Sequence, residues 1–523
     1  MVKETSPEIS RPANFKELAL RGARWFSAAR VLAELAAFGS SVIVARLVAP
    51  GEVGSAVIAL GVVMVAAAFF SECFSTPLVR QERVGRAHLQ VTLLLGLLSG
   101  IAMTLFFALV VSPLARFFPD PQVAELIRLA APVFVACGLD AVPTAVLQRR
   151  LAFRTLGVVE LASLVAGALV TVAAALSGLN APALVYGAMT ATAVHAALGW
   201  IIVFPPPPRW RPGLAGSLFS FGVPAGLSSL VSSLWRNVDY MIIGASLGAY
   251  QAGIYWRGFQ LGYEYQGKIS RVALQLALPV YSRLETVDRI KGVRGRIVRL
   301  HTAALFGPLL LLIPLAPVLV PWLYGPAWAP AVLPTQMLAV AGLVAVVLTG
   351  TGPLLLAVGR PRLLLAVNVV AVCTFATFVT VAAPHGLTAI CLAVVGFQAL
   401  NFLGVHLLLA RLFDLGWRSI VGDLAPAGCA SVALLIVAVP LTLALRGAGA
   451  PALVVLAVVV SSGAAVYVAV LRSVFPAAWL DLVSLVRRPP SRDDRPVAQA
   501  SPSSPAPTHV RTSPAPPSTT GVR

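Results

Sequence analysis

Charged residues are scarce in this chain of 523 residues. Only 11% of the residues are charged and 58% are hydrophobic, whereas a typical soluble domain carries about 25% charged residues. The mean hydropathy of +0.87 shows the same bias. The composition therefore excludes a soluble globular protein and predicts an all-α polytopic membrane protein.

Cysteine is also rare, and the common catalytic motifs are missing. The sequence has no C-x-x-C pair and no zinc-ligand spacing, so we expect no disulfide framework, no metal and no cofactor. It has no G-x-x-x-x-G-K-[ST] loop, no H-E-x-x-H helix and no nucleophile elbow, so we expect neither ATP hydrolysis nor a catalytic residue. The cysteines lie in or beside apolar segments and are expected to be small buried hydrophobes: Cys73, Cys137, Cys373, Cys391 and Cys429.

A cleavable signal peptide is not expected either. The first residues, MVKETSPEISRPANFKELALRGAR, are polar and mixed in charge, and they lack a short apolar core with a small-residue cleavage site. We therefore expect the first membrane helix to act as the insertion signal.

Apolar runs of about twenty residues are abundant, and each is long enough to span a bilayer. We expect fourteen spans, with cores at 25–48, 53–76, 88–112, 124–147, 155–177, 181–204, 215–236, 252–276, 299–323, 331–357, 363–383, 387–410, 421–445 and 451–472. An alternative for the seventh span is a long or broken helix that runs on through 237–247.

Basic residues are concentrated in the loops of one side. The loops at 80–86, 148–154, 205–214, 283–299, 360–362 and 411–418 carry 18 Lys and Arg, whereas the seven other connections carry two. The positive-inside rule then predicts that both termini are cytoplasmic. Because the basic residues are spread between spans, the net charge of +19 does not indicate a nucleic-acid partner.

Ionisable side chains interrupt the first, seventh and eighth predicted spans. A charge at the bilayer centre costs about 2.5–3.5 kcal/mol on insertion scales, so such residues normally face a bundle interior or a watery cavity. In the eighth span they recur at spacings of seven, four, three and four, which a regular helix places on one face. The predicted substrate-binding residues are Arg30, Glu34, Arg236, Asp239, Arg257, Glu264, Lys268, Arg271 and Gln275. Because positive groups outnumber negative ones in the seventh and eighth spans, we expect a cationic cavity and an anionic cargo.

A purely structural interpretation of these residues stays open. Glu264 and Lys268, or Arg30 and Glu34, are four residues apart and could pair on one helix, and Arg236 could pair with Asp239. Further polar residues within spans could carry a coupling proton, although paired structural groups are the simpler interpretation: Glu72, Asp140, Glu160, His195, His406 and Asp423. Three aromatic residues that flank a predicted outward loop indicate an interfacial belt: Trp322, Tyr324 and Trp328.

The chain also resembles itself. VIVARLVAPGEVG at 42–54 aligns with MIIGASLGAYQAG at 241–253, and PTAVLQRR at 143–150 aligns with PLLLAVGR at 353–360. Six spans separate the copies, so both would enter the membrane in the same direction, as in a parallel repeat with a substrate site between two lobes. We expect an N-terminal cytoplasmic arm at 1–22, a six-helix N-lobe at 23–212, a six-helix C-lobe at 213–418, two more helices at 419–486 and a disordered Pro/Ser-rich cytoplasmic tail at 487–523.

Several longer stretches resemble a known family. They are GARWFSAARVLAELAAFGSSVIVARLVAPGEVGSAVIAL, LDAVPTAVLQRRLAFR, RNVDYMIIGASLGAYQAGIYWRGFQL and VLVPWLYGPAW. Over roughly residues 15–475 the chain resembles the polysaccharide-transporter (Wzx-like) branch of the multidrug/oligosaccharidyl-lipid/polysaccharide flippase superfamily. The resemblance implies a two-lobe core of twelve helices, often with two more. In lipid-pyrophosphate flippases of this superfamily, arginines of the first and eighth spans line the cavity, and Arg30, Arg257 and Arg271 occupy the corresponding spans.

The resemblance also implies a function. We expect a flippase that moves undecaprenyl-pyrophosphate-linked oligosaccharides across the bacterial cytoplasmic membrane by alternating access, with lipid-linked oligosaccharide and membrane lipids as partners. A polysaccharide polymerase and glycosyltransferases are candidate protein partners. The alternatives are a cation-coupled exporter of small molecules, a membrane polymerase or glycosyltransferase, and a non-transporting scaffold. A basic cavity argues against the exporter, and short outward loops argue against the polymerase.

Overall fold

The computed structural model describes residues 15–81, 84–114, 118–274, 281 and 287–486, and these residues form helices joined by short connections. The first half contains α1 (Phe15–Leu47), α2 (Pro50–Arg80), α3 (Arg86–Leu114), α4 (Gln122–Ala130), α5 (Val133–Arg149), α6 (Phe153–Leu176) and α7 (Asn180–Val203). The second contains α8 (Pro212–Leu247), α9 (Ala249–Phe259), η2 (Gln260–Glu264), α10 (Tyr265–Leu274), α12 (Val287–Tyr324), η3 (Pro326–Ala331), α13 (Val332–Leu348), α14 (Thr351–Ala357), α15 (Pro361–Ala382), η4 (Ala383–His385) and α16 (Leu387–Phe413). We call these sets the N-half and the C-half. They are followed by α17 (Trp417–Gly447), α18 (Ala452–Val474) and α19 (Pro476–Val486).

Twelve helical segments of the described residues are long and apolar enough to cross a membrane. They match twelve of the predicted spans, so the expectation of an all-α polytopic membrane protein is confirmed. The first and eighth predicted spans fall on α1 and on the run from α9 to α10, where charged side chains are concentrated. For these two segments, a membrane span stays a prediction, and so does the total of fourteen spans. The seventh span is one helix of 36 residues, α8.

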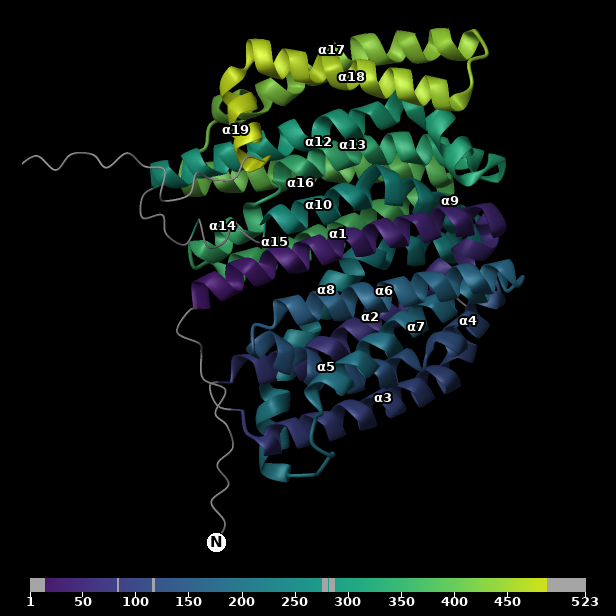
Figure 1. The fold of residues 1–523 in the computed structure, drawn as a ribbon, viewed down its shortest axis with the longest axis vertical. Helices are drawn as coiled ribbons and strands as arrows, with labels where there is room; N and C mark the ends of the chain where they lie inside the picture. Colours follow the sequence, from purple (N-terminus) through teal and green to yellow (C-terminus); the bar gives the residue numbers. More distant parts are fainter. Residues whose placement is uncertain (1–14, 82–83, 115–117, 275–280, 282–286, 487–523) are drawn as a thin grey trace, which may run out of the picture.

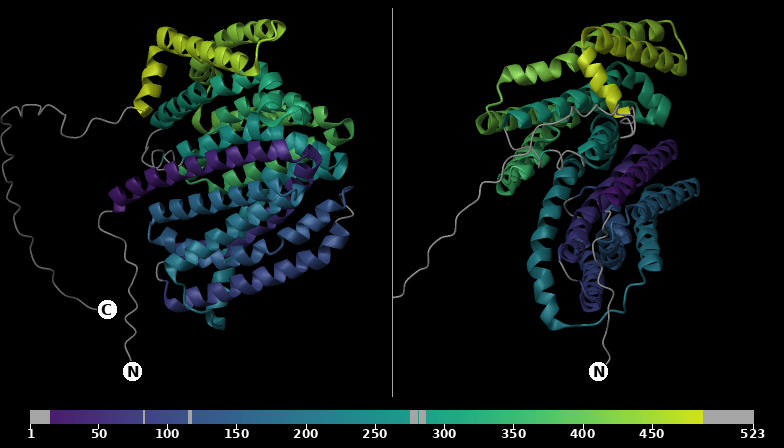
Figure 2. Two further views of the ribbon diagram at one scale, coloured as in Figure 1. Left: turned by 45° about the vertical axis from the view of Figure 1, so that its right-hand side comes forward. Right: turned by 60° about the vertical axis from the view of Figure 1, so that its left-hand side comes forward.

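The helices lie side by side in one bundle (Figure 1). Helices α2 to α7 occupy one part of the bundle, α9 to α16 occupy another, and α17 and α18 lie at its edge. Helix α1 runs between the two halves, and α8 extends as a long helix from the level of one half to that of the other (Figure 2). We call the end of the bundle where α1 meets α2 the distal end.

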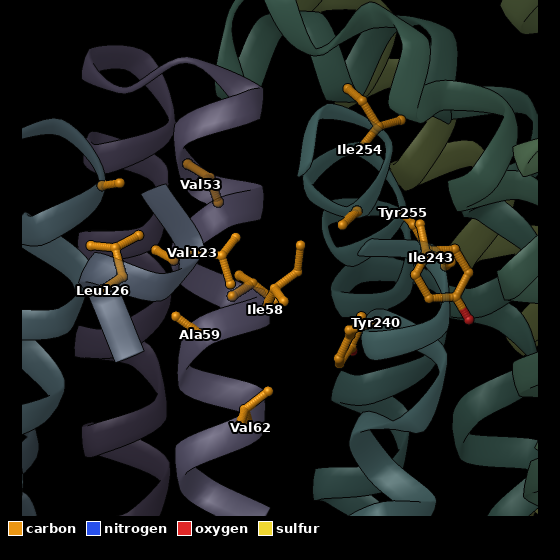
Figure 3. Packing of buried hydrophobic residues seen from close by; sticks show 14 of the residues in the cluster. Val53, Ile58, Ala59, Val62, Val123, Leu126, Tyr240, Ile243, Ile254 and Tyr255 are labelled. Atoms are coloured by element: carbon orange, nitrogen blue, oxygen red, sulfur yellow. The ribbon is translucent and has the colours of Figure 1, made fainter. Parts of the chain in front are cut away.

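Buried apolar residues join the halves near the distal end (Figure 3). Val53 and Ile58 of α2 and Ile243 of α8 are at most 1% exposed. Helix α8 packs on α2 so closely that an added Cβ at Gly222 would lie 2.1 Å from the carbonyl oxygen of Cys73. At Gly244 it would lie 2.4 Å from the side chain of Ile58. Small residues of this kind let membrane helices approach each other.

The closest approach between the halves is reciprocal. A Cβ added to Gly54 of α2 would lie 1.7 Å from the carbonyl oxygen of Ala249, and one added to Gly253 of α9 would lie 2.0 Å from that of Pro50. Gly54 and Gly253, like Pro50 and Ala249, are related by the 199-residue shift of the sequence repeat. The aligned stretches thus lie at equivalent helix junctions, α1–α2 and α8–α9, and touch each other there.

The cysteines differ from expectation in part. Cys73 and Cys391 are buried and Cys137 is half-buried, but Cys373 on α15 and Cys429 on α17 are exposed. The expectation of burial was wrong for these two because an apolar side chain in a membrane protein can face lipid as well as the protein core.

We expect Gly54→Ala and Gly253→Ala each to lower stability by about 1–3 kcal/mol, the usual cost of overpacking a close contact. Thermal unfolding of the purified protein in detergent would measure this. Gly51→Ala is the control, because nothing lies within 4 Å of its Cβ position on the first turn of α2. Equal unfolding temperatures for all three variants would contradict the close contact.

Candidate functional site

A cavity of about 750 Å³ lies between α8 and the helices α9 to α16 of the C-half. Its wall combines aromatic rings with amides and hydroxyls. The aromatic lining residues are Trp235, Tyr240, Trp256, Phe259 and Tyr263, and the amide-bearing ones are Asn237, Gln266, Asn368 and Asn401. Apolar surfaces with a few placed polar groups are typical of ligand sites.

Two charged residues, Arg236 of α8 and Glu264 of η2, belong to the described lining of this cavity. Arg236 is exposed and forms no ion pair with any described residue. The pair of Arg236 with Asp239 that the structural interpretation allowed is therefore not formed. With one cation and one anion, the described wall is less cationic than we expected from the sequence.

Lys268 of α10 connects the cavity wall to α1. Its Nζ lies 2.8 Å from Oε2 of Glu34 on α1 and 3.2 Å from Oε1 of Glu264. The three side chains are between 25% and 31% exposed, so none of them is fully buried. The predicted i,i+4 pair thus exists, and it is part of a three-residue cluster that spans the two halves.

Arg30 pairs with Glu160 of α6 at 3.0 Å, rather than with Glu34 one turn further along α1. Helix α1 therefore presents two charged residues in succession to different partners. Arg30 faces the N-half, and Glu34 faces the C-half.

Arg257 does not line the cavity. A π-turn, η2, follows it, and such a turn contains one more residue than an α-turn, so the later residues are rotated away from its face. Arg257 is 1% exposed. It donates hydrogen bonds to Ser41 of α1 and Gln260.

Three aromatic rings surround the Arg257 guanidinium. They belong to Tyr324, Trp328 and Trp256, at 4.3, 4.7 and 4.8 Å from ring centroid to guanidinium carbon. Such cation–π contacts stabilise a desolvated arginine. Tyr324 and Trp328 are 0% exposed, so the expectation that they form an interfacial belt was wrong, whereas Trp322 is 38% exposed.

The remaining predicted site residues lie apart from the cavity or beyond what is described. Asp239 is 1% exposed. Its carboxylate accepts hydrogen bonds at 2.9 Å from the hydroxyl of Tyr255 and the backbone N–H of Tyr240. Arg271 is on α10, but its side chain, like all of Gln275, lies outside the described residues. The structure therefore brings together Glu34, Glu264 and Lys268.

The amides of the cavity were not predicted as site residues. Asn368 of α15 and Asn401 of α16 lie within apolar spans that carry few other polar groups. Polar residues inside spans normally face other helices or a cavity, so their isolation in the sequence was a usable signal.

The other polar residues within spans are mostly paired. His195 of α7 contacts Asp140 of α5 at 2.9 Å, and Arg299 of α12 contacts Asp423 of α17 at 2.6 Å. Glu72 accepts a hydrogen bond from Thr76 on its own helix. The His406 ring packs in a tilted orientation against Trp417, with 3.8 Å between ring centroids. No group of three or more metal-ligating side chains occurs among the described residues.

Comparison with known proteins assigns the family. Residues 43–333, more than half of the chain, match the family of polysaccharide biosynthesis proteins. The chain belongs to this family. It is a Wzx-like flippase of the multidrug/oligosaccharidyl-lipid/polysaccharide superfamily, and thus a transporter rather than an enzyme.

Two curated relatives of this flippase are similar in sequence. The lipopolysaccharide biosynthesis protein WzxC of Escherichia coli is 24% identical over 409 residues, which cover 75% of this chain and 78% of WzxC. The teichuronic acid biosynthesis protein TuaB of Bacillus subtilis is 24% identical over 297 residues, 55% of this chain and 61% of TuaB. The match therefore spans less than two thirds of TuaB.

Two solved structures show the same fold. The lipid II flippase MurJ in an inward closed conformation superposes with a TM-score of 0.67 at 12% identity, covering 88% of this chain and 99% of MurJ. An inward-facing multidrug resistance MATE transporter gives 0.55 at 15% identity, covering 74% of this chain and 96% of the transporter. At these identities the likeness concerns the fold alone.

We expect Lys268→Met to lower the free energy of unfolding by about 1–2 kcal/mol. It removes a partner from two half-buried carboxylates, and partial solvation keeps the loss below that of a fully buried pair. A double-mutant cycle with Glu34→Gln, measured by thermal unfolding, should give a coupling energy of about 1 kcal/mol. Arg236→Met, which breaks no ion pair of the described residues, is the matched control. Strictly additive effects of Lys268→Met and Glu34→Gln would contradict the pair.

Proposed function

We propose that this flippase translocates undecaprenyl-pyrophosphate-linked oligosaccharides, of the exopolysaccharide or O-antigen type, across the bacterial cytoplasmic membrane. The observation that carries the proposal is the exposed Arg236, which forms no ion pair with the described residues, in the wall of a cavity otherwise lined by aromatic rings and amides. WzxC and TuaB are proteins of lipopolysaccharide and teichuronic acid biosynthesis, which supports a saccharide cargo.

The chemistry of the wall fits such a head group. A guanidinium binds phosphate oxygens through charge-assisted, bidentate hydrogen bonds, which suits Arg236 to the pyrophosphate. The amides of Asn368 and Asn401 can donate to and accept from sugar hydroxyls. The rings of Trp256 and Tyr263 offer apolar faces with polar edges. The polyprenyl tail would stay in lipid throughout.

Alternating access between two lobes is the mechanism that we propose. The reciprocal contact of Gly54 with Gly253 supports a two-fold rotation that relates the N-half to the C-half, about an axis that passes through the distal end. With both termini cytoplasmic, as the loop charges predict, the distal end is the outer face and is closed here. Rocking of the halves would separate α2 from α9 and open the cavity outward.

The predicted site residues take different parts in this proposal. Arg236 and Glu264 contact the head group in the cavity. Arg30, Glu34 and Lys268 lie where the halves meet. The head group contacts them when the two halves separate. Arg257 and Asp239 instead hold the aromatic packing behind the cavity. Substrate contacts of Arg271 and Gln275 stay predictions from the sequence.

We expect native protein in liposomes to move a fluorescent polyprenyl-pyrophosphate glycan between leaflets. An impermeant quencher would report the crossing. Arg236→Ala should slow crossing about tenfold or more, because it removes charge-assisted hydrogen bonds of about 1.5–3 kcal/mol. Arg257→Ala should lower the unfolding temperature, because it empties a buried site.

Arg411→Ala is the matched control, since Arg411 is an exposed arginine near the end of α16 and outside the cavity wall. Unchanged crossing by a folded Arg236→Ala protein would refute the role of the arginine. A folded native protein that moves no glycan lipid, yet exports organic cations, would favour the small-molecule exporter.

A further inference from the structure

The N-half contains a titratable pair that the cavity does not use. His195 of α7 and Asp140 of α5 lie near the middle of their spans, with Nδ1 of the ring 2.9 Å from Oδ1 of the carboxylate. The hydroxyl of Thr144 donates to the other carboxylate oxygen at 3.0 Å. An ionised Asp140 only accepts hydrogen bonds, so in the state that we consider Nδ1 of His195 carries the hydrogen. Nε2 is then the nitrogen that can take up a further proton.

The pair is partly exposed. The side chains of His195 and Asp140 are 23% and 18% exposed, so they are not sealed in the core. Ionisable residues within spans are costly, and they mark proton relays and substrate pathways in many membrane proteins. Histidine is also the side chain whose ordinary pKa, about 6.5, lies closest to neutral pH.

A series of charged side chains, some of them in direct contact, lies between the pair and the cavity. Glu160 of α6 acts electrostatically on His195 and forms the 3.0 Å ion pair with Arg30. Arg30 and Glu34 are one turn apart on α1, and Glu34 contacts Lys268, which contacts Glu264 in the cavity wall. The series crosses from the N-half to the C-half through α1.

We propose that the Asp140–His195 pair is the proton-binding site that couples lipid transport to the proton gradient, and that α1 conveys its charge state to the cavity. The inference rests on the proposed flippase function and adds its energy source. One proton from the outer side binds Nε2 of neutral His195 to give an imidazolium, and the same proton leaves on the cytoplasmic side. No covalent bond other than N–H is made or broken.

The charge change acts on α1 through Glu160. Neutral His195 with ionised Asp140 carries one negative charge, whereas the protonated pair carries none. The imidazolium then competes with Arg30 for Glu160 and weakens the contact between α1 and α6. The equilibrium in question lies between α1 in contact with α6 and α1 released from it. Protonation can shift this equilibrium because the proton is bound with a different free energy in the two arrangements.

Other charged or titratable groups lie on the helices that pack around this site, among them Arg86 and His88 near the start of α3, which packs against α5. Cys137 of α5 interacts electrostatically with Asp140, but a thiol does not ordinarily ionise near neutral pH. Helices α2 and α4 also pack against α7. Glu72 of α2 is engaged by Thr76, while Glu52 and Glu125 belong to the first turns of their helices at the distal end.

The test uses proteoliposomes with a pH difference of one unit, acid on the side that receives the lipid. If one proton is exchanged for each lipid, native protein should accumulate the labelled glycan lipid about tenfold on the acidic side. His195→Gln, which keeps a hydrogen-bond donor but cannot titrate in this range, should give a ratio near one. His385→Gln, in the exposed turn η4, should retain the native ratio.

A second readout does not depend on transport. Spin labels at the exposed positions Leu179 and Leu333, in a background without native cysteines, report the distance between the halves at pH 5.5 and pH 8. We expect a pH-dependent distance in the native background and none with His195→Gln.

The outcomes separate the two proposals. Crossing without any response to the gradient keeps the flippase and refutes this coupling site, as does a gradient response that survives His195→Gln. If no glycan lipid crosses, the proposed function fails. The spin-label distances then decide the proton site alone: a shift that requires His195 supports it, and a shift that is absent or independent of His195 refutes it.

Discussion

The cost of placing a charge inside a membrane governs the arrangement of this protein. Desolvation of an ion within a bundle is offset only by a partner or by water, and the described charges of the spans follow this rule. Arg30, Glu34 and Lys268 are paired across helix interfaces, and Arg257 is enclosed by aromatic rings. Several of these contacts involve α1. This helix therefore connects charged residues of the two halves, although the cores of the halves are apolar.

Much of the fold could be predicted from the sequence, because hydropathy over twenty residues depends on composition and little on tertiary context. The repeat aligns the helix junctions at 47–50 and 247–249 with each other, and glycine recurs at 54 and 253, where the structure brings the two backbones together. The site was harder. A regular helix would place Arg257 and Glu264 on one face, and the π-turn at Gln260–Glu264 breaks that register without an evident signal in the sequence.

Long-range packing accounts for the other differences. The environment of Arg257 is built by Tyr324 and Trp328, about seventy residues away in the chain, and no local pattern announces such a contact. The same two rings were predicted to form an interfacial belt because they flank a loop. The loop instead folds inward onto α1, where the indole of Trp328 donates a hydrogen bond to the carbonyl oxygen of Ala45 at 2.6 Å. Pairing partners such as Glu160 for Arg30 also come from different helices. The sequence could predict which charged residues need a partner, but it could not predict which residue the partner would be.

Helix α8 has a mechanical consequence. In the sequence, α8 is the first helix of the second repeat. Its glycines nevertheless bring its backbone against α2 of the first repeat. Its contacts with the other helices of the C-half include ring contacts, such as that of Trp235 with Phe397. Close backbone packing resists sliding, whereas side chains can exchange partners between packed elements. In the proposed rocking, α8 therefore stays with α2, and the cavity wall that it forms moves relative to the wall formed by η2 and α10. Arg236 and Glu264 lie on these two walls, so the proposed movement changes the separation between them.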